Sequence, residues 1–543
     1  RYRGKTDCPE CKGTRLRGDA AYVKVGGKNL LELVLLPIDE ALVFFENLEV
    51  STFDERITKR LLPEITNRLR FLTEVGLTYL TLNRRSNSLS GGESQRINLA
   101  TSLGSSLVGS MYILDEPSIG LHPRDTDRLI KVLHNLRDLG NTVIVVEHEE
   151  DIIRAADEVL DIGPMAGVYG GEVVFQGDHK ALLQAKNSLT ADYLTGQKVI
   201  PTPTHRRKSK NVLQFSGIYK NNLKGVEVSL PLHSMVCITG VSGSGKSTLL
   251  KEIVYPAVRQ HLGELASTTG AQFEAEGDWK HIKAVEMIDQ NPIGKSTRSN
   301  PASYVKAFDD IRDLFSKLPL AKARGYKPGF FSFNVVGGRC EICEGEGIIT
   351  VGMQFMADIH LKCETCEGTR YKQETLEIHY REKSIADILD MDIDTAVQFF
   401  SDSGEKTDAK ILEKIQPLQD VGLGYLKMGQ ASSTLSGGEA QRVKLASFLS
   451  KGIKATPTLF IFDEPTTGLH FHDVQKLIIA MQRLVDVGHS VFIIEHNNEV
   501  IKCADWIVDI GPDGGKHGGQ IVFTGTPEDL VECKESWTGK YLR

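Results

Sequence analysis

The stretch Gly240-Val-Ser-Gly-Ser-Gly-Lys246-Ser247-Thr248 matches the phosphate-binding loop pattern G-x-x-x-x-G-K-[ST] at every position. Residues 236–239 before it are apolar enough for a short buried strand, and the chain from Leu249 onward suits a helix. In that strand–loop–helix context, backbone N–H groups can surround a phosphate at the start of a helix. The stretch therefore predicts a nucleotide site.

Each residue type in this loop has its own expected role. The three glycines that bring bare backbone close to a phosphate are Gly240, Gly243 and Gly245. Lys246 can reach the β- and γ-phosphates, and the hydroxyl of Ser247, followed by Thr248, can bind Mg²⁺. A nucleoside triphosphate with Mg²⁺ is thus the expected ligand.

Length and composition limit the possible classes of protein. The chain has 543 residues, 41% of them hydrophobic and 25% charged, with a formal net charge of −7 at pH 7. This length predicts several domains, and no apolar run is long enough to span a membrane. A chain of this charge can bind nucleic acid only through a local basic face. Its nine cysteines suit a reducing, cytoplasmic setting.

The chain opens with a single cysteine pair, Cys8-Pro-Glu-Cys11. A zinc site needs four ligands, so the partners of this pair either precede residue 1 or do not exist. Because the first residues run directly into the pair, we expect the chain to begin within a domain. Residues 37–83 have helical spacing of Leu, Ile and Phe and are expected to form a packing subdomain.

A block of motifs follows and then recurs. Leu89-Ser-Gly-Gly-Glu93 precedes a helical run, Met111-Tyr-Ile-Leu-Asp-Glu-Pro117 reads as a buried strand ending in acids, and a second buried strand ends at His148. Asp161-Ile-Gly-Pro164 and residues 170–177 complete the block as a turn and a hairpin.

The second copy of the block contains Leu435-Ser-Gly-Gly-Glu439, the acids of Asp463-Glu-Pro465, the strand ending at His496, and the closing residues 509–525. Asp115 and Asp463 are 348 residues apart, as are His148 and His496. This is a duplication of a large unit, far longer than a solenoid repeat. We interpret the basic run Arg206-Arg-Lys208 between the copies as a solvated linker in preference to a nucleic-acid patch.

The residues that end the acidic and histidine strands suggest hydrolysis of a nucleotide with bound Mg²⁺. An acid at the end of an apolar strand can hold Mg²⁺, which makes Asp463 the expected metal ligand. Glu464 can orient or deprotonate an attacking water, and His496 can contact the γ-phosphate. Gln290, after the apolar residues 284–288, can contact the metal or the water.

The glycine motifs add a second expected anion cradle. Ser436-Gly437-Gly438 and Ser90-Gly91-Gly92 each offer a hydroxyl and bare backbone at the start of a helix. Taken alone, such a motif could be no more than a helix cap, and an acidic strand could be an ordinary strand end.

In this order and in duplicate, the motifs resemble those of the ABC-type ATPases. In that family two modules face head to tail, and each nucleotide lies between one module's phosphate loop and the other's signature motif. The resemblance implies ATP as the nucleotide. It implies a first site in which Ser90-Gly91-Gly92 faces Lys246, Ser247, Gln290, Asp463, Glu464 and His496. It implies a second site in which Ser436-Gly437-Gly438 faces Asp115, Glu116 and His148. The phosphate loop of the second site is not in this chain, so we expect that site to be crippled.

A further cysteine pattern lies between residues 291 and 430. Cys340 and Cys343 are followed, after nineteen residues, by Cys363 and Cys366. This C-x₂-C…C-x₂-C spacing predicts a closed structural zinc site with four thiolate ligands. The alternative is four core cysteines without metal. The nineteen residues between the two pairs, which include Ile348-Ile-Thr-Val-Gly-Met-Gln-Phe355, could form a hairpin that projects from the metal.

Basic and aromatic residues alternate before the cysteines. The cations are Lys295, Arg298, Lys306, Arg312, Lys317, Lys322, Arg324 and Lys327, and the aromatic residues are Tyr304, Tyr326, Phe330, Phe331 and Phe333. Such a segment is the best candidate in the chain for a nucleic-acid face. The alternative is a solvated surface with an aromatic core beneath it.

An ABC-type ATPase with a zinc insertion at this position resembles the UvrA family of bacterial nucleotide excision repair. The residues that carry the resemblance are Gln290-Asn-Pro-Ile-Gly294, Arg298-Ser-Asn-Pro301, Phe331-Ser-Phe-Asn334, Gly337-Gly-Arg-Cys340, Gly468-Leu-His470 and Ala504-Asp-Trp-Ile-Val-Asp-Ile-Gly-Pro512. It implies a homodimer that binds damaged duplex DNA, loads the helicase-like partner UvrB and uses ATP. It also implies phosphate contacts by Lys295, Arg298 and Arg339, and that the family's first phosphate loop and UvrB-docking domain would precede Arg1.

Three other classes compete with this interpretation: a UvrA-like paralogue in drug tolerance, a membrane transporter ATPase, and a non-hydrolysing DNA-binding scaffold. The zinc insertion and fused tandem modules argue against a transporter. The intact set of Lys246, Asp463 and Glu464 argues against a scaffold.

The expected fold class is α/β, with tandem ABC-type ATPase modules, helical signature subdomains and a zinc-binding insertion. The predicted segments are a signature and zinc-module remnant (1–80), the end of the first ATPase module (81–195), a linker (196–210), the start of the second module (211–290), its signature and insertion region (291–430), and its end (431–543).

Overall fold

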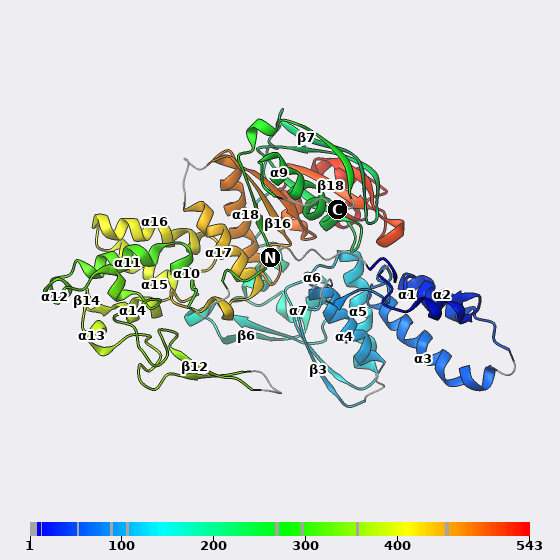
Figure 1. Ribbon diagram of the computed structural model, residues 1–543, viewed down its shortest axis with the longest axis horizontal. Coiled ribbons are helices and arrows are strands. Elements are labelled where there is room, and N and C mark those ends of the chain that lie inside the picture. Colours follow the sequence, from blue (N-terminus) through cyan, green and yellow to red (C-terminus); the bar gives the residue numbers. More distant parts are fainter. Residues whose placement is uncertain are drawn as a thin grey trace. The chain divides into compact units, whose positions relative to one another are not determined.

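The computed structural model describes residues 8–11, 13–51, 54–86, 89, 91–104, 108–265, 271–294, 298–353, 358–450 and 456–543. It contains two compact units, each built from segments far apart in the sequence (Figure 1). The first unit comprises Arg1–Val159, Pro201–Trp279 and Ile494–Arg543, and the second comprises Leu160–Ile200 and Lys280–Ile493. Each unit therefore combines parts of both sequence copies. The six segments defined from sequence motifs remain a prediction.

The first unit holds the phosphate loop together with most motifs of the first copy. Its helices are η1 (Gly18–Tyr22), α1 (Leu30–Val34), α2 (Ile38–Glu46), α3 (Glu55–Glu74), α4 (Gly91–Leu103), α5 (Pro123–Asp138), α6 (Glu150–Ala155), η4 (Thr248–Val254), α9 (Tyr255–His261), η5 (Trp279–His281, which begins here), α19 (Asn498–Cys503), η8 (Gly515–His517), α20 (Pro527–Glu532) and α21 (Trp537–Leu542). Its strands are β1 (Lys24–Val25), β2 (Lys28–Asn29), β3 (Met111–Asp115), β4 (Thr142–Val146), β7 (Val212–Lys220), β8 (Leu223–Pro231), β9 (Met235–Thr239), β10 (Gln272–Gly277), β18 (Trp506–Gly511) and β19 (Gln520–Gly525).

Sheet pairing in the first unit sets the position of the phosphate loop. Strand β9 pairs in parallel with β18, with Trp506 opposite Val236, and β18 pairs antiparallel with β19. All five residues of β9 are buried, as expected for a strand that leads into a phosphate loop. Strands β10, β7 and β8 form a separate antiparallel sheet.

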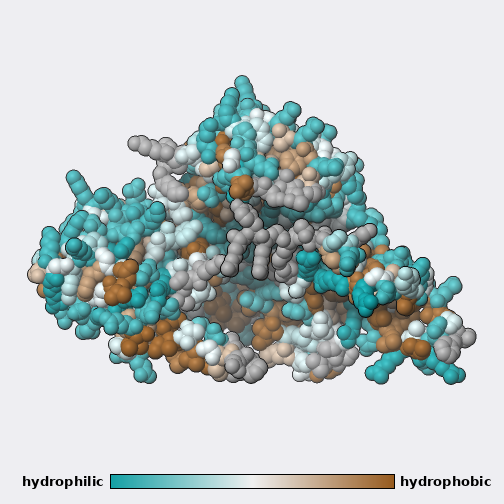
Figure 2. Space-filling model, in the orientation of Figure 1, coloured by the Kyte–Doolittle hydropathy of each residue, from teal (hydrophilic) through white to brown (hydrophobic). Residues whose placement is uncertain are grey.

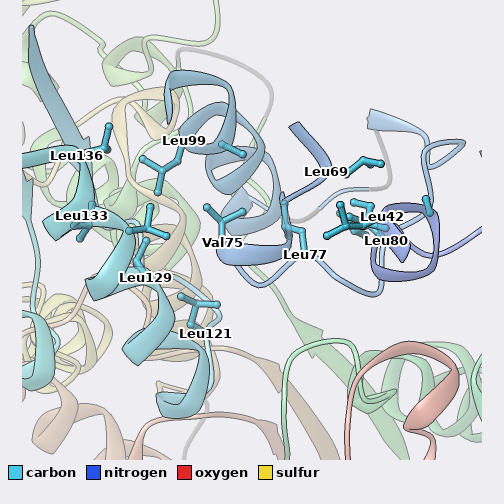
Figure 3. Close-up of a cluster of buried hydrophobic side chains, with 14 of the residues drawn as sticks. Leu42, Leu69, Val75, Leu77, Leu80, Leu99, Leu121, Leu129, Leu133 and Leu136 are labelled. Carbon is cyan, nitrogen blue, oxygen red and sulfur yellow. The ribbon is translucent and has the colours of Figure 1, made fainter. Parts of the chain in front are cut away.

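The helical part of this unit packs around one apolar cluster, drawn in Figure 3. Helix α5 begins at a His122 cap followed by Pro123, and it buries Leu129, Val132, Leu133 and Leu136 at helical spacing. Leucines of α2, α3 and α4 complete the cluster. The expected helical subdomain over residues 37–83 is therefore confirmed, with α2 and α3 as its main elements.

The first-copy strands β3 and β4 are less buried than predicted. They pair in parallel, but Met111 and Ile113 on β3 and Ile144 and Val146 on β4 are exposed. Among the described strands β3 pairs only with β4, and the exposed side chains alternate along both strands, so they share one face of this small sheet. An apolar run alone cannot reveal whether both faces of its strand are covered.

The expectation that the run Arg206-Arg-Lys208 is solvated is wrong for its two arginines. The side chain of Arg206 is only 11% exposed and donates hydrogen bonds to the carbonyl oxygens of Lys502 (2.7 Å) and Ala504 (2.9 Å) at the end of α19. It also pairs with Glu528 at 2.7 Å. Arg207 pairs with the buried carboxylate of Asp505 at 3.0 Å. These arginines satisfy carbonyls and acids that the fold leaves at a helix end.

Replacing Arg206 by alanine is therefore expected to lower the free energy of unfolding by about 1–3 kcal/mol, because two helix-end carbonyls lose their donor. Lys208→Ala is the matched control, since the exposed Lys208 belongs to the same run and should shift stability by less than about 0.5 kcal/mol. Urea unfolding of both variants measures the difference. Equal stabilities would show that the contacts of Arg206 do not stabilise the fold.

The second unit contains the cysteine insertion and the signature motif of the second copy. Its helices are η3 (Gly167–Tyr169), α7 (His179–Leu182), α8 (Leu189–Leu194), α10 (Pro301–Tyr304), α11 (Ala307–Ser316), α12 (Pro319–Ala323), η6 (Pro328–Phe331), α13 (Gln373–Leu376), α14 (Ile385–Asp390), α15 (Ile393–Ser401), α16 (Lys406–Asp420), η7 (Ser432–Thr434), α17 (Gly437–Leu449) and α18 (Phe471–Asp486). Its strands are β5 (Val159–Gly163, which begins in the first unit), β6 (Glu172–Gly177), β11 (Ala284–Ile288), β12 (Ile348–Val351), β13 (Ile359–Lys362), β14 (His379–Tyr380), β15 (Lys383–Ser384), β16 (Thr458–Asp463) and β17 (Ser490–Ile494).

Two strand pairs of the second unit bear on the sequence motifs. Strands β11 and β16 pair in parallel with Ile288 opposite Phe462, so the residues after them lie at the same sheet edge. Strands β12 and β13 form the expected antiparallel hairpin next to the cysteines. Exposed Ile349, Val351 and Leu361 give this hairpin a hydrophobic surface, which Figure 2 shows at lower left.

The aromatic residues of the insertion form a core. Phe331 and Phe333 are fully buried, and Phe333 stacks on Phe308 with ring centroids 4.9 Å apart. Tyr326 and Phe330 stack on each other at 3.7 Å. The sequence left a nucleic-acid face and an aromatic core as alternatives for this segment, and these contacts favour the core. In the described parts of the chain, no helix combines the length and apolar character that a membrane span requires.

Candidate nucleotide site and metal centre

The phosphate loop lies between β9 and the π-helical segment Thr248–Val254, which α9 continues. The predicted strand–loop–helix context is thus confirmed. Lys246 is 6% exposed, and its Nζ donates hydrogen bonds to the carbonyl oxygens of Gly240 (2.9 Å) and Val241 (2.8 Å). The amine is therefore held over the loop whose N–H groups could receive a phosphate.

Two glycines of the loop are required by their surroundings. Gly240 has φ +127°, and a Cβ there would lie 1.9 Å from the carbonyl oxygen of Ile510. Gly243 has φ +74°, and a Cβ there would lie 2.9 Å from the ring of Tyr79. Side chains rarely adopt these φ values, and neither position has room for one.

Tyr79 links the phosphate loop to the first signature motif. Its ring lies against Gly243, and its hydroxyl donates a hydrogen bond to Glu93 of Leu89-Ser-Gly-Gly-Glu93 at 2.7 Å. Within the first unit, the second copy's loop therefore approaches the first copy's signature helix α4. Sequence reasoning missed Tyr79, although a signal exists: Tyr425 precedes the second signature motif and donates to Glu439 at 2.6 Å.

Two buried polar atoms close to this loop suit a ligand. The Oγ of Ser244 and the Nδ1 of His496 have no hydrogen-bond partner within the described residues. Burial, together with the charge of Lys246, holds the pKa of His496 well below its usual value, so the imidazole is neutral. Buried polar atoms are normally paired, so these two fit a site that a bound phosphate group would complete.

The acids of the first copy gather with its histidine. Asp115 ends β3, and Glu116 has φ 45°, a left-handed conformation that is uncommon for a non-glycine residue. Glu116 Oε1 lies 3.9 Å from the Nε2 of His148. Burial and the neighbouring charges of Asp115 and Glu147 raise the pKa of Glu116. Three of the predicted second-site residues are therefore close together.

The acids of the second copy gather in the same way in the second unit. Glu464 has φ 46°, which matches the strained conformation of Glu116. Gln290 Nε2 donates to the hydroxyl of Thr467 at 3.2 Å and approaches the carbonyl of Glu464 at 3.5 Å. Gln441 from α17 donates to the carbonyl of Asp463 at 3.2 Å. The fold thus places Gln290, Asp463 and Glu464 at one sheet edge.

The second signature motif is a helix cap. Ser436 Oγ accepts a hydrogen bond from the backbone N–H of Glu439 at 3.2 Å. The Glu439 carboxylate accepts one from the backbone N–H of Ser436 at 2.7 Å, which completes a capping box. A Cβ on Gly437 would lie 3.1 Å from Gln290, and one on Gly438 would lie 2.9 Å from the carbonyl of Thr467. In the first copy, Ser90 lies outside the described residues, and Gly91 begins α4.

The predicted site residues therefore fall into two groups, one in each unit. The first unit holds Lys246, Ser247, Thr248, His496, Gly92, Asp115, Glu116 and His148, and the second unit holds Gln290, Asp463, Glu464, Ser436, Gly437 and Gly438. The composite sites that would join the two groups stay a prediction.

The cysteine insertion has the geometry of a metal centre. The four Sγ atoms of Cys340, Cys343, Cys363 and Cys366 all lie within 4.8 Å of one another, and all four residues are buried. The Sγ atoms of Cys343 and Cys366 are 3.6 Å apart. This distance is close to the roughly 3.8 Å between two sulfurs of a thiolate tetrahedron around zinc. The N–H of Gly347 also approaches the Cys343 sulfur at 3.2 Å. Four thiolates are a ligand set that suits zinc. The other cysteine pair, Cys8 and Cys11, has no third ligand within the described residues.

The predicted DNA contacts lie beside this centre. Arg298 and Arg339 both approach the carboxylate of Glu344, at 3.3 and 3.9 Å, and Glu344 directly follows Cys343. Lys295 lies outside the described residues. Both arginines therefore help to hold the metal knuckle, and a phosphate would have to compete with Glu344 for them.

Comparisons with known proteins agree with this description. The ABC transporter family profile matches residues 223–467. The "UvrABC system protein A" of Clostridium perfringens is 52% identical over the whole chain, and that of Thermus thermophilus is 54% identical over 98% of it. These alignments cover 57% and 56% of the relatives, so the chain spans little more than half of their length. The crystal structure of UvrA2 from Deinococcus radiodurans superposes with a TM-score of 0.89 at 42% identity, covering 99% of this chain and 66% of that one.

The phosphate loop, the duplicated acidic strands and the signature helices define an ABC-type ATPase fold with a four-cysteine insertion. Over its whole length, the chain belongs to the UvrABC system protein A family. The resemblance noted from sequence is thus confirmed.

Proposed function

We propose that this chain is the larger part of an ATP-hydrolysing DNA-damage recognition protein of nucleotide excision repair, a protein that acts as a homodimer, binds distorted duplex DNA and loads UvrB. The family match over all 543 residues carries the proposal. The buried Lys246 and the unpaired Nδ1 of His496 support a working nucleotide site. The relatives' printed names favour repair over drug tolerance or transport.

Each site residue has a proposed role. ATP with Mg²⁺ supplies the phosphoryl chemistry when bound. Lys246 and the N–H groups of Gly243 and Gly245 hold phosphate oxygens, while Ser247 and Asp463 hold the metal. Glu464 orients or deprotonates water, and its left-handed backbone is of the kind that gathers at functional sites.

The remaining roles concern recognition and sensing. His496 contacts the γ-phosphate and so senses its presence. Gln290 contacts the metal or the attacking water. The Ser90-Gly91-Gly92 motif faces Lys246 across the composite site, and Ser436-Gly437-Gly438 faces the acids of the first copy. With zinc bound, the insertion would present its hairpin to the DNA backbone, and Lys295, Arg298 and Arg339 are the proposed phosphate contacts. Recognition is by shape and deformability, because a lesion sensor cannot depend on particular base edges.

Binding to duplex DNA with and without one bulky adduct, each with ATP and without nucleotide, tests this proposal. Binding should be tighter to the damaged duplex and should depend on ATP. Because phosphate contacts dominate, both affinities should fall as salt rises, while their ratio persists. Equal, nucleotide-independent binding to both duplexes would refute damage recognition by this chain.

A further inference from the structure

A buried hydrogen-bond chain runs from the loop after the first acidic strand to the C-terminal helix α21. His122 caps α5: its Nδ1 accepts a hydrogen bond from the N–H of Arg124 at 3.2 Å. Its Nε2 lies 3.2 Å from the Oγ1 of Thr538 on α21. Thr538 Oγ1 lies in turn 3.2 Å from a carboxylate oxygen of Asp509. All of these side chains except that of Arg124 are at least nine-tenths buried.

The chemistry of the groups fixes the direction of this chain. An Nδ1 that accepts a hydrogen bond carries no proton in the neutral imidazole, so the proton is on Nε2. Nε2–H of His122 therefore donates to Thr538, whose hydroxyl donates to Asp509. The charge of Lys246 nearby adds to burial in keeping His122 neutral: together they lower its pKa to about 3.

An equivalent series of hydrogen bonds occurs in the second unit. Nδ1 of His470 accepts from the N–H of His472 at 3.2 Å, and Nε2 lies 3.2 Å from Thr190 Oγ1. Thr190 donates to Asp161 at 3.1 Å. In each unit, the histidine comes from one sequence copy and the threonine and aspartate come from the other. The arrangement is thus repeated atom for atom across the duplication, and the copy at Thr190 provides a matched comparison for the copy at Thr538.

The hydrogen-bond series of the first unit, His122–Thr538–Asp509, approaches the nucleotide site at two points. The ring of His122 meets the ring of His496 edge to face, with centroids 6.0 Å apart. The hydroxyl of Thr538 lies 3.5 Å from that of Thr239, the residue directly before Gly240 of the phosphate loop. His122 itself lies in the loop that begins at Glu116. His122 thus contacts the histidine of the other copy directly, and it reaches the residue before the phosphate loop through Thr538.

We propose that His122 is a positioning residue: held by Thr538, its ring keeps His496 oriented to recognise a γ-phosphate, and so couples the acidic loop of the first copy to the nucleotide site at Lys246. This inference rests on the proposed function, because it takes ATP as the ligand of that site. His122 would act through His496 and would not touch the nucleotide.

Nucleotide binding by the full chain tests the coupling. His122→Asn keeps an acceptor that can cap α5 but loses the Nε2 donor and the ring. Thr538→Val removes the hydroxyl while keeping the volume, and Thr538→Ser restores the hydroxyl. Thr190→Val, in the equivalent chain of the other unit, is the matched control. Calorimetric titration with Mg·ATP and Mg·ADP gives both dissociation constants for each variant.

The expected result is an ATP affinity about five- to tenfold weaker in His122→Asn and Thr538→Val, with ADP affinity unchanged. Thr538→Ser should recover the ATP preference, and Thr190→Val should keep it. Equal losses for ATP and ADP would mean a merely structural role and overturn the proposal. So would an unchanged ratio in both variants, or a wild-type chain that does not prefer ATP. Normal ATP binding by Lys246→Ala would instead overturn the proposed function itself.

Discussion

Replacing Lys246 by alanine is expected to reduce ATP hydrolysis by about a hundredfold to a thousandfold, because the site loses the cation that would stabilise charge on the transferred phosphoryl group. Phosphate release under saturating ATP measures the effect. The buried amine also donates to the carbonyls of Gly240 and Val241, so the loss of these bonds should cost about 1–3 kcal/mol of stability.

Two further variants separate the chemical effect from the structural one. Lys246→Met keeps the aliphatic stem that fills the loop and should be as inactive as the alanine variant while unfolding closer to wild type. Lys283→Ala, at an exposed lysine of the same chain, should hydrolyse ATP normally. Full activity in Lys246→Met would remove Lys246, and with it the assigned phosphate loop, from the proposed mechanism.

The motifs that sequence reasoning placed correctly are local in the chain. The loop at Gly240–Thr248 carries its own strand and helix, and the cysteine pairs carry their own spacing, so nearby residues were enough to predict both. The duplication was equally visible, because Asp115 and Asp463 stand at matching points of two copies. Backbone conformation repeats as well: Glu116 and Glu464 both adopt φ near 45°.

The residues that sequence reasoning missed have partners far away in the chain. His122 meets Thr538, and Tyr79 meets Gly243, across long separations that no spacing rule covers. Arg206 looked like part of a solvated run because its partners at the end of α19 follow almost 300 residues later. Charge and polarity describe a residue, whereas burial depends on which distant segment the fold brings to it.

The expected covering of β3 and β4 was wrong for a related reason. Their sequences are as apolar as those of β16 and β17, yet β17 is buried throughout and β16 is buried at every position between its two end residues. An apolar sequence shows that a strand is suited to burial. Whether its side chains are buried depends on the layers that pack against the sheet. A prediction from one strand at a time cannot contain that information.

Cys363→Ser is expected to abolish zinc binding, because a closed structural site holds zinc with all four thiolates and a serine hydroxyl is a poor ligand for it. The zinc content per chain, measured by mass spectrometry of the metal after exhaustive dialysis, should fall from one to near zero. Zinc contributes about 10–16 kcal/mol in structural sites of this kind, far more than the packing of a two-stranded hairpin. The β12–β13 hairpin should therefore lose its order, and DNA binding should fall with it.

Two measurements make this prediction specific to the four-cysteine centre. Cys8→Ser should keep one zinc per chain, since in the described residues Cys8 and Cys11 have no third ligand. Cys363→Ser should still bind ATP, because the phosphate loop belongs to the first unit and the cysteines belong to the second. Unchanged zinc in Cys363→Ser would mean that the cysteine cluster is a packed core without metal. Loss of ATP binding together with zinc would mean that the insertion supports the fold of the whole ATPase, and that its order is required before either ligand can bind.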